Sequence, residues 1–229
     1  MSKAKTTTTT RGRKRQNPAL ELQAEPLIVI IGAFNDKIFR DPKWDANYLF
    51  EGCKPSDVAV NINLNITDDR INTVITRNGT ELTLAGTRLQ IKVAQMDEYG
   101  FSEAMDIVKR LALCIPHTPI ASFGVNFTYQ TSLKKTNGNV LAGISPGDGW
   151  KTIESRTVKP TECGDMACVC SLENDKKLLT ISFNFHNKMD GKSLTDIKNK
   201  LMDGLIGKAL ETSRPLAETM RRAYEGVEE

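Results

Sequence analysis

One segment of the chain alternates apolar and polar residues so regularly that an amphipathic β-strand is its natural structure. The apolar positions are Val58, Val60, Ile62, Leu64 and Ile66, and between them lie Ala59, Asn61, Asn63, Asn65 and Thr67. Successive side chains of a strand point to opposite faces, so this pattern predicts a strand with one face against a core. Asp68 and Asp69 then predict a turn, and Asn78 followed by Gly79 is typical of a tight β-hairpin.

Several other segments also have strand character. The apolar run 27–31, which is β-branched from Ile28 onward, predicts a buried strand at the centre of a sheet. Further strands are expected at 71–77, from 82, at 89–93, 123–129, 153–158, 166–172 and 179–185. The apolar positions change parity at Ala85 and Gly86, which indicates a bulge or a second turn there.

Helical periodicity follows two of these strand groups. Apolar residues recur at helical spacing over 102–115, with Ser102 as the expected N-cap, and short helices are expected within 35–52. A second long helix is predicted after Ser193, whose spacing to Asp196 matches a capping box. The sequence at 213–215 is expected to end that helix at Pro215 and to leave a short final helix.

These elements predict an α+β fold. It consists of antiparallel sheet or sheets of about seven to nine strands, with two main helices packed on one face. The order of elements occurs twice, which suggests a pseudo-duplicated meander-plus-helix arrangement with halves at 23–118 and 119–229. This arrangement resembles the doubled sheet-and-helix topology of TATA-binding-protein-like folds, a likeness that implies nothing about function.

The positive charge of the chain is concentrated at its N-terminus. Residues 1–20 contain six lysines and arginines and no acidic residue, which leaves 25 basic against 28 acidic residues in the remainder. Because no large apolar side chain lies between Met1 and Leu20, residues 1–22 are predicted to be a disordered basic arm before a single α+β domain at 23–229. Arg11, Arg13, Lys14 and Arg15 are the expected contacts to nucleic acid or to an acidic partner.

The same features predict a cytoplasmic protein. The N-terminus has no apolar region of the kind found in signal peptides, and 27–31 is too short to span a bilayer, so no membrane association is expected. The five cysteines are an odd number, which is typical of reduced thiols.

Three of these cysteines lie close together, at Cys163, Cys168 and Cys170. With His117 or His186 they provide a possible zinc ligand set, but the spacing is not the paired pattern of structural zinc sites. Buried core thiols are therefore the preferred interpretation, and we expect no metal or cofactor.

A second candidate site follows the last predicted strand. Gly191, Lys192 and Ser193 match the end of a phosphate-binding loop, but His186 occupies the position where that motif requires a glycine. The capping-box interpretation explains the same residues. No nucleophile or paired-carboxylate pattern accompanies the two histidines, so an enzyme is not the expected class.

The polar faces of the clearest strands are unusual because they carry no charge. They comprise Asn61, Asn63 and Asn65, then Ser122, Gly124, Asn126 and Thr128, then Thr180, Ser182, Asn184 and His186. Asparagine is a poor strand former, and a neutral, amide-rich surface suits hydrogen bonding to a partner. The candidate docking face is therefore formed by Asn61, Asn63, Asn65, Asn126 and Asn184. The alternatives are that a second layer covers this face or that the polar side chains only pair across strands.

Together these observations predict a non-enzymatic binding or assembly protein, a subunit of a larger intracellular complex. Other protein subunits are its expected partners, with nucleic acid reached through the arm. The alternatives are a nucleotide- or phosphate-dependent enzyme with its site around His186, Lys192 and Ser193, and a virion or phage structural protein.

Overall fold

The computed structural model describes residues 20–50, 52–65, 70–133, 152–173 and 176–225. From the N-terminus the strands are β1 (Glu21–Leu22), β2 (Ile28–Gly32), β3 (Ala59–Asn65), β4 (Arg70–Arg77), β5 (Thr80–Ala85), β6 (Arg88–Lys92), β7 (Ile120–Ser132), β8 (Thr152–Thr161), β9 (Gly164–Glu173) and β10 (Leu178–Lys188). The helices are α1 (Pro42–Trp44), α2 (Glu98–Cys114), α4 (Leu194–Met202) and α5 (Leu205–Glu225), with single turns η1 (Ile38–Arg40), η2 (Asp45–Leu49) and η3 (Pro55–Asp57).

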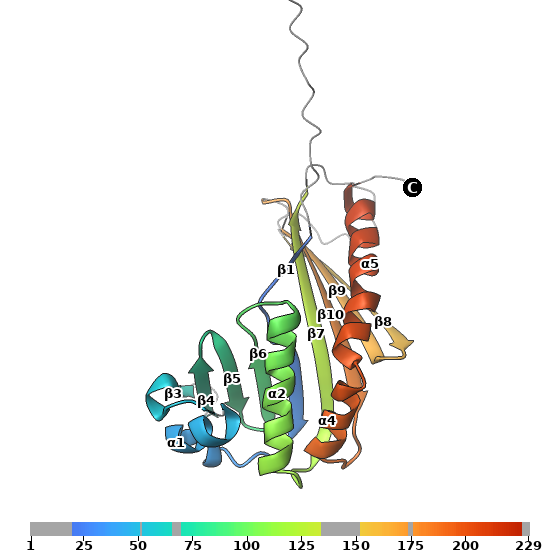
Figure 1. Ribbon diagram of the computed structural model, residues 1–229. Coiled ribbons are helices and arrows are strands. Elements are labelled where there is room, and N and C mark those ends of the chain that lie inside the picture. The colour runs from blue at the N-terminus through green and yellow to red at the C-terminus, as the bar shows by residue number, and fades with distance from the viewer. Residues whose placement is uncertain (1–19, 51, 66–69, 134–151, 174–175, 226–229) are drawn as a thin grey trace, which may run out of the picture.

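Within the described residues, ten strands form one antiparallel sheet, which confirms the α+β class. The order is β3-β4-β5-β6-β2-β7-β10-β9-β8, and β1 pairs with β7 beyond the end of β2 (Figure 1). As its apolar run predicts, β2 lies at the centre, between β6 and β7. Leu27, Ile28 and Ile30 are completely buried there.

Two tight turns among the described residues connect β4, β5 and β6 of the first meander. Asn78 and Gly79 have φ values of 50° and 84° between β4 and β5. A two-residue hairpin turn with positive φ at both positions is the type that suits the twist of the flanking strands, so the predicted hairpin is confirmed. At Gly86, φ is 58°, and the chain turns from β5 into β6. The parity change therefore marks a second turn.

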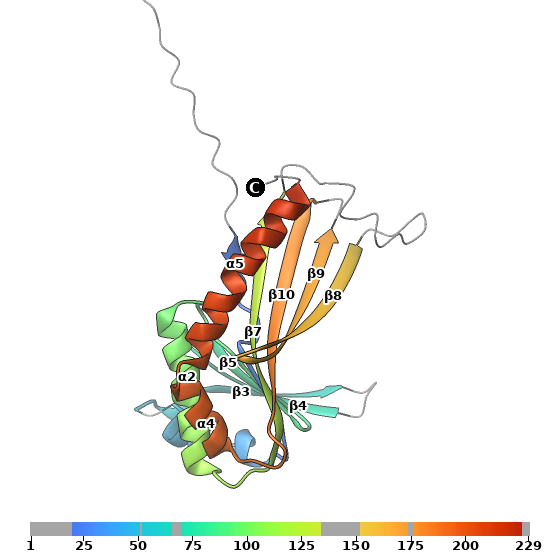
Figure 2. The same ribbon diagram turned by 90° about the vertical axis from the view of Figure 1, so that its right-hand side faces the viewer.

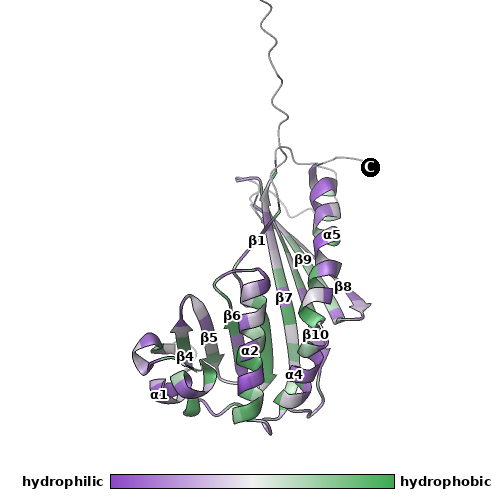
Figure 3. Cartoon of the chain, viewed as in Figure 1, coloured by the Kyte–Doolittle hydropathy of each residue, from purple (hydrophilic) through white to green (hydrophobic). Residues whose placement is uncertain are grey.

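The helices α2, α4 and α5 all lie on one side of the sheet (Figures 1 and 2). Their apolar surfaces turn toward the strands (Figure 3), and the core between them contains Phe123, Phe127, Phe183 and Phe185 from the sheet. The aromatic side chains alternate with polar residues along β7 and β10, so each strand gives one face to this core.

Helix α2 begins five residues earlier than the sequence suggests. Its N-cap is Asp97, whose carboxylate accepts a hydrogen bond from the Gly100 amide at 3.0 Å. Ser102 is exposed within the helix, so its prediction as N-cap is wrong. The first turn also requires Gly100, because a Cβ at this position would lie 1.9 Å from the Gln95 carbonyl oxygen.

The last helical segment is interrupted at a different point from the predicted one. The break falls at Asp203 and Gly204, where Gly204 has a φ of 83°, and α5 continues through Pro215. Pro215 and Glu211 are exposed. The Glu211 carbonyl, which loses its amide partner at the proline, can therefore bond to water. The prediction that Pro215 ends the helix is wrong for this reason.

The two halves repeat one arrangement of elements. In the first, β2 is followed by a meander whose last strand, β6, returns to its side, and then by α2. In the second, β7 is followed by a meander whose last strand, β10, returns to its side, and then by α4 and α5. The halves join where β2 pairs with β7 and where α2 packs against α4.

No helix in the described part of the chain has both the length and the apolar character needed to cross a membrane.

Candidate docking face

The sheet face opposite the helices is uncovered over the described residues (Figure 2). Residues that pair directly across antiparallel strands share a face. The register connects both halves in this way: Asn61 opposes Val74, Val74 opposes Thr83, Thr83 opposes Gln90, Gln90 opposes Val29, and Val29 opposes Gly124. Asn126, two residues after Gly124, opposes Asn184. We call this surface the open face.

All five asparagines of the candidate docking face belong to strand positions on the open face. Asn61 and Asn63 are exposed at one end of the sheet, whereas Asn126 and Asn184 are partly buried near its centre. Asn65 occupies the next position of the same parity on β3. Within the described ranges no second layer lies over them, and the central pair is engaged in cross-strand hydrogen bonds.

The open face is not uniformly neutral. Its neighbouring strands add Arg88 and Lys92 from β6, Glu81 from β5 and Asp165 from β9, at register positions that share the face. Among the described residues, the uncharged part is the strip along β7 and along β10 as far as His186, and Lys188 follows at the end of β10. Sequence reasoning missed Arg88, although the apolar residues at 89, 91 and 93 already assign the even positions of β6 to the polar face.

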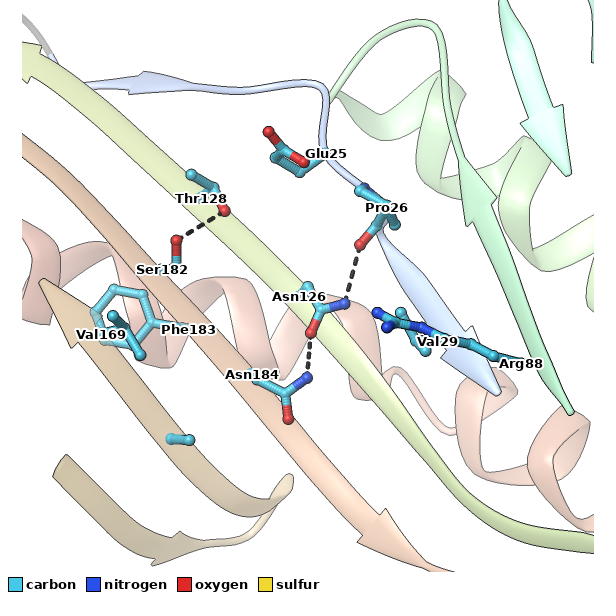
Figure 4. A pocket seen from close by; sticks show the side chains of 11 residues that line it. Glu25, Pro26, Val29, Arg88, Asn126, Thr128, Val169, Ser182, Phe183 and Asn184 are labelled. Carbon is cyan, nitrogen blue, oxygen red and sulfur yellow. Dashed lines mark hydrogen bonds between the residues drawn. The ribbon is translucent and has the colours of Figure 1, made fainter. Parts of the chain in front are cut away.

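A hollow of about 270 Å³ lies at the centre of this face (Figure 4). It is lined by residues of five strands and of the segment before β2, namely Glu25, Pro26, Val29, Arg88, Asn126, Thr128, Ala167, Val169, Ser182, Phe183 and Asn184. Apolar Val29, Ala167 and Val169 form part of its floor beside the amides. The hollow therefore offers both apolar contact and hydrogen-bonding groups.

Hydrogen bonds hold the central amides in a defined orientation. Asn126 donates its side-chain N–H to the Pro26 carbonyl oxygen at 3.0 Å, and Asn184 donates to the Asn126 carbonyl (Figure 4). The hydroxyl groups of Thr128 and Ser182 bond to each other at 3.1 Å. At the end of this series of hydrogen bonds lies the Asn184 side-chain oxygen. It has no partner among the described residues and is free to accept a hydrogen bond from a ligand.

Arg88 carries a positive charge at the rim of the hollow, which Glu25 also lines. Its Nε and Nη2 atoms donate to the side-chain oxygen of Gln90 at 3.0 and 2.8 Å when that amide is oriented to accept them. The described residues provide no carboxylate partner within ion-pair distance of Arg88. A neutral acceptor fixes the guanidinium without cancelling its charge, so it remains available to an anionic group.

The basic arm is attached beside this hollow. Glu21 and Leu22, which the sequence assigns to the arm, instead form β1 against Gln130 and Tyr129 of β7. The Gln23 amide then donates to the Thr128 carbonyl oxygen at 2.9 Å, and the chain continues to Glu25 and Pro26 in the hollow's lining. Arg11, Arg13, Lys14 and Arg15 lie outside the described residues. Arg15 precedes Leu20 by five residues, so the chain allows at most about 18 Å between them.

The possible phosphate site is occupied by a side chain of the protein itself. Asp196 accepts hydrogen bonds from the Ser193 amide at 2.9 Å and from its hydroxyl at 3.0 Å, which confirms the capping box. These bonds lower the pKa of the Asp196 carboxyl. Lys192 is exposed in the turn, and His186 projects from the open face opposite Gly124. The three residues therefore do not form a shared anion pocket.

The three clustered cysteines separate in the fold. Cys168 and Cys170 lie on the core face of β9 beside Met220 of α5. Cys163 is buried at the turn before β9, where Thr212 hydrogen-bonds its thiol and burial raises its pKa. Thr212 and Met220 are eight residues apart on α5, or about 12 Å along its axis. Over the described residues, no three His, Cys, Asp or Glu side chains are grouped to hold a metal.

The fold and this site define an α+β protein with a ten-stranded antiparallel sheet, helices on one face and a partly polar open face on the other. Comparison with protein families, with curated proteins and with solved structures finds no match for this chain.

Proposed function

We propose that this chain is a non-enzymatic binding protein that holds a nucleic acid across the open face, with the basic arm contacting its phosphates. The observation that carries the proposal is the attachment of the arm at β1, beside the central hollow. The arm and the open face can therefore act on the same ligand. In the cell we propose that the protein is a cytoplasmic subunit of a larger complex.

The chemistry of the two parts is complementary. Residues 21–229 have a net charge of −3, so attraction to a polyanion depends on the arm. Phosphate contacts position a nucleic acid, whereas base edges are recognised by donors and acceptors such as amides. The free Asn184 oxygen and the Arg88 guanidinium supply an acceptor and a charged donor beside the arm's attachment point.

The test compares the full chain with two arm variants, a deletion of residues 1–19 and the fourfold change R11A/R13A/K14A/R15A. Binding to labelled DNA and RNA oligonucleotides is followed by anisotropy between about 50 and 200 mM salt. Losing four phosphate contacts should reduce the salt slope of log K by about three to four units. The matched control is K198A/K208A, which removes two lysines from the helical side and should leave the slope unchanged.

A second pair of variants tests the open face. Arg88→Ala and Asn184→Asp should each weaken binding by roughly tenfold, as expected for the loss of one charged or base-edge contact. Asn199→Asp, exposed on α4 on the helical side, is the control for a general effect of added charge. Equal binding by the full chain and the arm deletion, or no binding by either at low salt, would contradict the nucleic-acid function.

A further inference from the structure

Three sulfur atoms from two elements meet on the helical side of the sheet. The Cys168 and Cys170 Sγ atoms are 3.9 Å apart, and each lies close to the Met220 Sδ atom, at 3.6 and 3.5 Å respectively. The two cysteines are adjacent positions on one face of β9, and Met220 reaches them from α5. We call these three side chains the sulfur triad.

The size of this triangle matches a metal ion at its centre. The point equidistant from the three sulfurs lies about 2.1 Å from each, which follows from the three distances between them. A metal–thiolate bond is about 2.3 Å long. Met220 has a flexible side chain, so a displacement of a few tenths of an ångström suffices to open the triangle to that size.

We propose that the sulfur triad is a binding site for a soft monovalent cation, Cu(I), with two cysteine sulfurs and one thioether as ligands. Thiolate and thioether ligands together select soft metals. Structural zinc requires four ligands from cysteine, histidine or carboxylate side chains, and the described residues place no such group of three together. A three-sulfur site therefore favours Cu(I) over zinc.

The surroundings are compatible with such a site. Cys168 and Cys170 are 3% and 4% exposed, so water does not compete for the metal, while Met220 is partly exposed and gives a route of entry. The hydrogen bond between the thiols, together with burial, raises the pKa of Cys168, and the same hydrogen bond lowers the pKa of Cys170. Each thiol that becomes a ligand releases its proton to solvent, so affinity should increase with pH.

The test is an anaerobic titration in which the full chain competes for Cu(I) with the chromogenic chelator bathocuproine disulfonate. We expect one Cu(I) per chain to be withdrawn by the wild type and none by C168A/C170A. The matched controls are Cys163→Ala, buried on the same hairpin, and Cys114→Ser on α2. Both should retain full uptake, whereas uptake abolished by either control, or kept by C168A/C170A, would overturn the site.

Met220→Leu keeps the proposal testable if the double variant does not fold. This substitution conserves volume and should preserve the melting temperature of the metal-free protein. It should lower Cu(I) affinity by at least roughly tenfold, since even outer-shell changes have effects of that size. X-ray absorption at the copper edge should show three sulfur neighbours in the wild type and two in this variant. Two sulfurs in both proteins would exclude Met220 as a ligand.

Discussion

At the scale of single residues, a buried carboxyl without hydrogen-bond partners affects how the stability of the protein depends on pH. Asp45 is completely buried in the turn η2, and within the described structure neither of its side-chain oxygens has a hydrogen-bond partner. Burial, with the nearby Asp41 carboxylate, raises the pKa of Asp45 from 3.8 to about 7. The folded state therefore favours the protonated form, while the unfolded chain ionises at lower pH.

We expect Asp45→Asn to change how stability depends on pH. Because burial raises the pKa of Asp45 in the folded state, the stabilisation from its protonated form is complete below pH 4. This stabilisation is lost as the pH rises through 7, which lowers the free energy of unfolding by about 4 kcal/mol. The variant should be more stable than the wild type at pH 8 and should show a flatter profile between pH 4 and 7. Urea melts across this range measure it, with exposed Asp203→Asn as the control. Parallel profiles for the wild type and D45N would refute the assignment.

Gly100 gives a second prediction at this scale. Alanine normally stabilises a helix relative to glycine by about 1 kcal/mol. At Gly100 the added Cβ would meet the Gln95 carbonyl at 1.9 Å, so Gly100→Ala should instead cost about 2 to 4 kcal/mol. Gly207→Ala on α5 is the matched control, since nothing lies within 4 Å of its Cβ position, and it should be neutral or stabilising. Thermal melts of both variants decide this.

At the scale of elements, periodicity predicted where strands and helices lie better than where they begin and end. The alternation along β7 and β10 fixed their buried faces, and the capping box at Ser193 was recognisable from spacing alone. The start of α2 was missed because both Asp97 and Ser102 are acceptable caps, and only the close approach of Gly100 to Gln95 distinguishes them.

The cap of α2 leads to a prediction that separates the two candidates. Asp97→Ala should destabilise the protein by about 1 kcal/mol, because it removes the acceptor of the Gly100 amide. Ser102→Ala should have an effect within about 0.5 kcal/mol, since this side chain is exposed in the helix interior. Chemical denaturation of both variants provides the measurement, and a larger loss in S102A than in D97A would contradict the observed cap.

At the scale of the whole molecule, the repeated order of elements was visible in the sequence but the way the halves join was not. A continuous apolar run predicts a central strand but does not indicate which strands pair with it. The pairing of β2 with β7 joins residues about a hundred positions apart. The gathering of Asn61, Asn126 and Asn184 on one face depends on that pairing. The sulfur triad likewise needs the docking of α5 on β9, which no local pattern encodes.

Deletion of residues 1–19 should leave folding intact at this scale. The melting temperature should match that of the full chain, since the described core begins at Leu20. Extending the deletion through residue 23 removes the pairing of β1 with β7 and the contacts of Leu20 and Leu22 with the core. This longer deletion should lower the melting temperature by several degrees. Calorimetry of the two deletions tests where the arm ends. Equal melting temperatures for both would show that β1 contributes nothing.

The central position of β2 also has a consequence for synthesis on the ribosome. β2 emerges early, and its partner β6 follows within about sixty residues, but its other edge stays unpaired until β7 has been made. During that interval the nascent chain presents an apolar strand edge of the kind that recruits other chains. A fragment that ends at residue 118 would keep this edge permanently, and it should self-associate in solution. The second half of the protein therefore protects the first half from self-association, because β7 covers the free edge of β2.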